Sequence, residues 1–113
     1  MKLQTIEKDE FTIIKVEEKR IDAVNAPELR QKINELSGTG QTRVILDISN
    51  VTFMDSSGLG VLVSILKMLG GSGELIIAGA NGIVSDLFKL TRMDRIFRMC
   101  DDPESAEQIM TVA

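Results

Sequence analysis

The segment Ile45–Leu69 constrains the fold more than any other part of the chain, because its pattern changes from strand to helix within a few residues. The run from Val44 to Ile48 is rich in β-branched and aliphatic residues and predicts a short strand. Ser49–Asp55 form a polar stretch around one apolar pair, which predicts a turn. Ser56–Leu69 are a long apolar run without a dominance of β-branched residues, so a helix is predicted there.

The junction between this turn and the helix carries residues that favour a helix start. Asp55, Ser56 and Ser57 are N-cap candidates, because their side chains can accept from the N–H groups that lack a partner in the first turn. The same N–H groups and the helix dipole favour an anion. Gly58 and Gly60 each cost a helix roughly 1 kcal/mol relative to Ala, so we expect something to approach the backbone closely there. Such a helix start could carry a phosphate without unfolding; a capped helix behind a tight turn is the simpler alternative.

The segments on either side alternate between strand and helix patterns. Leu3–Lys8 and Phe11–Glu17 predict an N-terminal hairpin. Asn25 is the predicted N-cap of a first helix over about Ala26–Leu36, with Pro27 in its first turn. The predicted elements after the central segment are a strand at Glu74–Ala78, a helix at Ile83–Leu90, a short strand at Ile96–Met99 and a last helix with Asp102 as N-cap and Pro103 at its first position.

This order of elements predicts an α/β fold. Alternation of strands and helices after a hairpin is typical of a mixed, mainly parallel sheet, here of about five strands with about four helices packed on it. At 113 residues we expect a single domain over residues 1–113. The helix that begins at Ser56 is apolar around much of its circumference, with Leu59, Leu62, Val63, Leu66 and Leu69 on one face and Val61, Ile65 and Met68 beside them. We expect burial of this helix, and the alternative is an apolar patch kept for a partner.

Composition excludes several classes of function. The formal net charge is -4, whereas a nucleic-acid binder or a protein that docks on an anionic membrane needs a basic face. No apolar run reaches the roughly 20 residues that span a bilayer, and Lys2 is not followed by the apolar stretch of a secretory signal. A single cysteine, Cys100, forms no internal disulfide and fits a reducing cytoplasm.

Catalytic and metal-binding patterns are also missing. The chain has no His, which excludes a Ser-His-Asp or Cys-His arrangement and a zinc site built on imidazole. Cys100 is therefore interpreted as a packing residue, since no base is present to activate it. The glycines around Ser72 lack the Lys-Ser/Thr pair of a phosphate-binding loop. We expect no enzyme activity, no cofactor and no metal; a site built on carboxylates alone is the catalytic alternative left open.

The string VTFMDSSGLGVL, from Val51 to Leu62, resembles the signature of the STAS-domain anti-sigma factor antagonists. The likeness continues in the Leu-Ile-Ile-Ala strand before Gly79, in Leu87–Thr91 and in Ile96–Phe97, and so covers most of the chain. In that family the first serine after the aspartate is phosphorylated, which implies Ser56 here. Ser57 is the alternative, and we expect it instead to satisfy helix N–H groups from inside.

The resemblance also implies a partner surface around this serine. It comprises Asp22, Asp55, Ser56, Ser57, Gly58, Leu59 and Gly60. Asp22 matches an aspartate that precedes the first helix in the family. Lys19 and Arg20 stand where the family commonly has Gly and an acidic residue, so the charges that face a partner differ from the usual pattern.

The function implied by the resemblance is partner switching in the cytoplasm. The unphosphorylated antagonist binds an anti-sigma factor, usually a serine kinase of the histidine-kinase-like ATPase type, and thereby frees the sigma factor. The kinase phosphorylates the serine and releases the antagonist, and a PP2C-type phosphatase reverses the modification. We expect a monomer, because the switch needs only one face. The alternatives are a STAS scaffold or transport-system subunit that does not switch, and a small-molecule or nucleotide sensor that uses the apolar helix.

Overall fold

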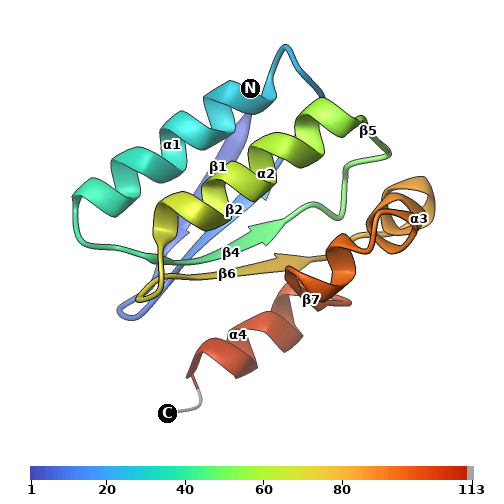
Figure 1. The fold of residues 1–113 in the computed structure, drawn as a ribbon. Coiled ribbons are helices and arrows are strands. Elements are labelled where there is room, and N and C mark those ends of the chain that lie inside the picture. The colour runs from blue at the N-terminus through green and yellow to red at the C-terminus, as the bar shows by residue number, and fades with distance from the viewer. Residues whose placement is uncertain (112–113) are drawn as a thin grey trace.

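Five strands form one sheet in which all but the first run parallel (Figure 1). The computed structural model describes residues 1–111, so the last two residues of the predicted domain 1–113 lie outside the described residues. The strands are β1 (Leu3–Glu7), β2 (Thr12–Val16), β4 (Arg43–Asp47), β6 (Glu74–Ala78) and β7 (Arg98–Cys100), in the order β1-β2-β4-β6-β7. β1 pairs with β2 antiparallel, and the other three pairings are parallel. The predicted α/β fold with a mixed, mainly parallel sheet is therefore confirmed.

Helices cover both faces of this sheet. They are α1 (Ala26–Gly38), α2 (Ser56–Leu69), α3 (Gly82–Leu90) and α4 (Pro103–Thr111). Figure 1 shows α1 and α2 side by side over one face and α4 against the other. On β4, Val44 and Leu46 pack in the cluster with α1, α2 and α3, whereas Ile45 packs toward α4. Because successive side chains of a strand point to opposite faces, burial on both sides explains why this strand is almost continuously apolar.

A separate pair of two-residue strands lies beside the main sheet. β3 (Arg20–Ile21) runs parallel to β5 (Phe53–Met54), with Arg20 opposite Phe53 and Ile21 opposite Met54. The sequence predicted only a turn around this apolar pair, because two residues are too few to show a strand period. The pairing fixes the segment before α1 against the segment before α2.

The prediction that the central helix is buried is confirmed. Leu59, Leu62, Ile65 and Leu69 of α2 are buried, and its remaining apolar side chains pack partly against the same core. The exposed large apolar side chains lie outside α2, among them Val24 before α1 at 86% exposure and Ile83 and Leu90 on α3 at 68% and 83%. The apolar side chains around α2 therefore pack within the fold and do not form the patch that was considered as the alternative.

The last predicted strand is shifted along the chain. It was expected at Ile96–Met99 and is found at Arg98–Cys100. A 3₁₀ turn at Met93–Arg95 continues into hydrogen bonds from the N–H groups of Ile96 and Phe97 to the Met93 carbonyl, which delays the strand. Phe97 is buried there as an anchor, edge to face with Phe88 at a centroid separation of 5.7 Å.

Two properties of the whole described chain bear on function. None of the helices within residues 1–111 combines the length and the hydropathy that a bilayer crossing requires. Over the same residues, Cys, Asp and Glu side chains do not gather into a group of three or more that could hold a metal ion.

Truncation of the aromatic pair tests this packing. We expect Phe88→Ala to lower the free energy of unfolding by about 3–5 kcal/mol, because it removes a fully buried ring and its edge-to-face partner contact. Ile83→Ala on the same helix serves as the control and should change the stability by less than about 0.5 kcal/mol. Urea denaturation measures both, and equal losses in the two variants would contradict the assigned faces of α3.

Candidate functional site

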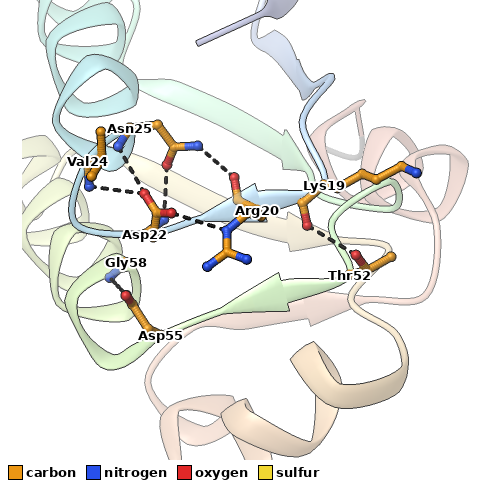
Figure 2. Close-up of polar contacts among 8 residues, drawn as sticks. All are labelled: Lys19, Arg20, Asp22, Val24, Asn25, Thr52, Asp55 and Gly58. Carbon is orange, nitrogen blue, oxygen red and sulfur yellow. Dashed lines mark hydrogen bonds and ion pairs between the residues drawn. The ribbon is translucent and has the colours of Figure 1, made fainter.

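The first turn of α2 carries the predicted phosphorylation site. Ser56 is the first residue of the helix, and Asp55 occupies the N-cap position with an extended backbone. The Gly58 N–H donates to Oδ1 of Asp55 at 2.8 Å (Figure 2). Asp55 is therefore the residue that caps the helix, and Ser56 and Ser57 are both exposed. The prediction that Ser57 satisfies helix N–H groups from inside is wrong, because Asp55 holds that donor and the Ser57 side chain lies on the outer side.

Gly58 is buried because β3 lies directly against the start of α2. A Cβ added to Gly58 would lie 2.5 Å from the carbonyl oxygen of Ile21, closer than any such contact in real proteins. Around Gly60, by contrast, an added Cβ would meet nothing within 4 Å. The predicted close approach is thus confirmed for Gly58 and wrong for Gly60. The side chain of Leu59, which follows Gly58, is buried in the core.

Asp22 closes the turn between β3 and α1. Its Oδ1 accepts from the N–H groups of Val24 at 3.0 Å and Asn25 at 3.2 Å, while its own N–H donates to Oδ1 of Asn25 at 2.9 Å (Figure 2). The Asn25 amide also donates to the carbonyl of Arg20 at 2.7 Å. Asn25 therefore stands at the N-cap position without capping α1, contrary to the prediction, because its side chain reaches back to β3 and Asp22.

These hydrogen bonds lower the pKa of Asp22. The bond from the Asn25 backbone has the largest effect on this pKa, and the Val24 N–H and the Arg20 side chain lower it further, while partial desolvation opposes them. A carboxylate that accepts several N–H groups is stabilised in its charged form. Asp22 is therefore a structural anion as well as a candidate contact for a partner.

Arg20 is held in place beside this turn. Its Nε donates to Oδ2 of Asp22 at 3.3 Å, and its guanidinium carbon lies 4.4 Å from the centre of the Phe53 ring. The Thr52 N–H donates to the carbonyl of Lys19 at 2.8 Å and extends the contact between the two segments. From the sequence, Arg20 was noted only as a departure from the family pattern. Its contact with Phe53 could not be predicted, because it depends on the register of β3 on β5.

The expected site residues are thus gathered on one corner of the molecule. The β3–β5 pair brings the Asp22 turn and the first turn of α2 together, although the two lie more than thirty positions apart in the sequence. Among the expected site residues, the side chains of Ser56 and Ser57 face solvent and those of Asp22 and Asp55 are half-buried; Arg20 beside them is also exposed.

A shallow cavity of about 700 Å³ lies at the other end of the sheet. It is lined by Arg43, Glu74 and Arg98, the first residues of three parallel strands, whereas Ser56 follows strand carboxyl ends. Arg43 is 3.2 Å and Arg98 3.6 Å from the Glu74 carboxylate, so the charges in this cavity pair with one another.

Comparison with known proteins agrees with this arrangement. The family model described as the STAS domain matches residues 2–106. This protein belongs to the STAS domain family. The anti-sigma-B factor antagonist of Staphylococcus aureus is 29% identical over 105 residues, which cover 92% of this chain and 96% of that protein.

Solved STAS structures share the same fold. An anti-sigma factor antagonist from Mycobacterium paratuberculosis superposes with a TM-score of 0.88 at 22% identity, over 98% of this chain and 94% of that chain. The Bacillus cell fate determinant SpoIIAA in its phosphorylated form gives a TM-score of 0.71 at 20% identity, over 96% of this chain and 99% of that chain. The unphosphorylated form of SpoIIAA gives 0.75 at 21% identity, over 98% and 100% of the two chains. At these identities the likeness establishes the fold.

The two glycines of this STAS domain are predicted to respond oppositely to alanine. Gly58→Ala should lower the free energy of unfolding by about 1–3 kcal/mol, because the new methyl group collides with the Ile21 carbonyl. Gly60→Ala should raise it by about 0.5–1 kcal/mol, because only the backbone entropy of the unfolded chain changes. Thermal and urea unfolding measure both; a stabilising Gly58→Ala would show that β3 does not rest on α2.

Asp22 gives a pH-dependent prediction. A carboxylate whose folded pKa is lowered stabilises the fold above its unfolded pKa of about 3.8, and that contribution is lost as the pH falls through the lower folded value. Asp22→Asn should therefore be less stable than the wild type at neutral pH, with a gap that narrows in acid. Asp86→Asn, on the exposed side of α3, is the matched control. If the difference in stability between wild type and Asp22→Asn stayed constant on acidification, the lowered pKa of Asp22 would be contradicted.

Proposed function

We propose that this protein is an anti-sigma factor antagonist that acts by partner switching in the cytoplasm. Its unphosphorylated form binds an anti-sigma factor that is a serine kinase of the histidine-kinase-like ATPase type, and the sigma factor is freed. Phosphorylation of Ser56 reverses this binding, and a PP2C-type phosphatase restores it. Membership of the STAS domain family and the similarity to the anti-sigma-B factor antagonist of Staphylococcus aureus support the proposal.

The main observation behind the proposal is that the residue that caps α2 is not the exposed serine beside it. Asp55 supplies the cap, so the hydroxyl of Ser56 is exposed and has no structural task. In the proposed reaction this hydroxyl attacks the γ-phosphorus of ATP, loses its proton and displaces ADP. The helix dipole then stabilises the added charge by roughly 0.3–1 kcal/mol.

Charge supplies the mechanism of release. A phosphate adds about -1.5 to -2 charges at neutral pH, next to the carboxylate of Asp55. A partner surface that accepts the neutral hydroxyl of Ser56 then meets a dianion, which costs binding free energy through desolvation and repulsion. The fold is expected to survive, because the backbone bonds of the first turn do not involve the Ser56 side chain.

An affinity experiment with three forms of the protein tests this switch. Wild type, Ser56→Ala and Ser56→Asp are used as baits in the native cytoplasm, with Ser57→Asp as the matched control on the adjacent exposed serine. We expect Ser56→Ala to retain a small ATPase-type kinase and Ser56→Asp to lose it by at least about tenfold in affinity, a loss of about 1.4 kcal/mol. Phosphopeptide mapping after incubation with that kinase and ATP should place the phosphate on Ser56.

Three results would count against the proposal. Equal retention of one partner by all baits would favour a STAS scaffold or transport-system subunit that does not switch. A phosphate on Ser57 would move the switch by one residue. A melting temperature of Ser56→Asp far below that of the wild type would mean that release reflects unfolding, whereas an exposed substitution should change the stability by less than about 0.5 kcal/mol.

A further inference from the structure

We propose that Arg20 is the internal counter-ion of phosphorylated Ser56: its guanidinium turns from Asp22 to the phosphate when Ser56 is modified. This inference rests on the proposed function, because it requires a phosphate on Ser56. It adds to the switch a residue outside Asp55–Gly58, and the role of that residue is to pair with the phosphate.

Arg20 lies on the strand that contacts the segments around Ser56. β3 contacts both segments that flank Ser56: Arg20 lies opposite Phe53 in the strand register, and the Ile21 carbonyl touches the first turn of α2 at Gly58. In Figure 2 the Arg20 guanidinium lies beside Asp22, in the space between β3 and β5, whereas the Lys19 side chain extends away. Arg20 is therefore the cation that lies over Phe53, three residues before Ser56 in the segment that leads into α2.

Arg20 also has hydrogen-bond donors that are not used within the described part of the fold. Its Nε donates to Asp22, but within residues 1–111 neither Nη1 nor Nη2 donates to a protein acceptor. The side chain is 61% exposed, so these two groups face solvent. Two parallel N–H donors on a planar fork match two oxygens of a phosphate, and such charge-assisted pairs are stronger than neutral hydrogen bonds.

The Arg20 guanidinium can exchange the Asp22 carboxylate for the phosphate without opening the turn before α1. Asp22 keeps two backbone N–H donors on Oδ1 when Arg20 leaves Oδ2, so the turn before α1 remains closed. The Phe53 ring supports the guanidinium from one side throughout, since a cation over an aromatic face is stabilised in either orientation. A phosphate dianion attracts the guanidinium more strongly than the single charge of Asp22.

The test uses protein with phosphoserine incorporated at position 56 during translation, so it needs no kinase. The second pKa of phosphoserine is about 6, and a neighbouring cation lowers it by favouring the dianion. A phosphorus NMR titration should give a pKa that rises by roughly 0.2–0.7 of a unit in Arg20→Gln. Arg98→Gln is the matched control, because Arg98 is also paired with a carboxylate and 56% exposed but is the first residue of β7, at the other end of the sheet.

The outcomes separate this inference from the proposed function. An unchanged phosphoserine pKa in Arg20→Gln, or an equal rise in Arg98→Gln, overturns the counter-ion role even if Ser56 controls partner binding. Should Arg20→Gln fail to fold, the Nε–H proton resonance of Arg20 in the otherwise unsubstituted protein decides the question: it shifts on phosphorylation if the guanidinium changes partner, and an unshifted resonance overturns the proposal. Failure of the proposed function appears separately, as unchanged partner retention by Ser56→Asp.

Discussion

The candidate site depends on the contact between the Ile21 carbonyl and the backbone of Gly58. This contact leaves no room for a side chain at position 58, and it fixes the distance between two segments that are far apart in the sequence. The β3–β5 pair supplies the direction of approach, since Ile21 lies opposite Met54 in its register. Together, the strand pairing and this contact hold the Asp22 turn against the start of α2.

Capping by Asp55 has a consequence for the serine that follows it. The first N–H groups of a helix need acceptors, and a serine that supplied one would be tied to the backbone. Because Oδ1 of Asp55 takes the Gly58 N–H, the Ser56 hydroxyl is not committed to the helix. The order Asp-Ser therefore places the residue that caps the helix directly before the exposed serine that we propose to be phosphorylated.

Sequence analysis predicted the long elements well and the short contacts poorly. Ser56–Leu69 was predicted with the bounds that α2 has, because a long apolar run with a capping residue before it carries much local information. The pairing of β3 with β5 was missed, since it depends on two residues from each of two distant segments. The roles of Asn25 and Ser57 were misassigned for a related reason: both residue types favour caps, but the Asn25 side chain bonds to Asp22 and Arg20 instead, and Asp55 supplies the side-chain cap of α2.

The arrangement of charges explains how a modification could change binding while the fold persists. One cation, Arg20, and two carboxylates, Asp22 and Asp55, lie on one corner, and each carboxylate already accepts from at least one backbone N–H. Those backbone bonds, rather than the ion pair, hold the two turns closed, because an exposed ion pair contributes little to stability. In the proposed switch, a dianion on Ser56 therefore redirects an exposed cation without releasing a backbone group, so phosphorylation changes the charge of the surface and leaves the core beneath it intact.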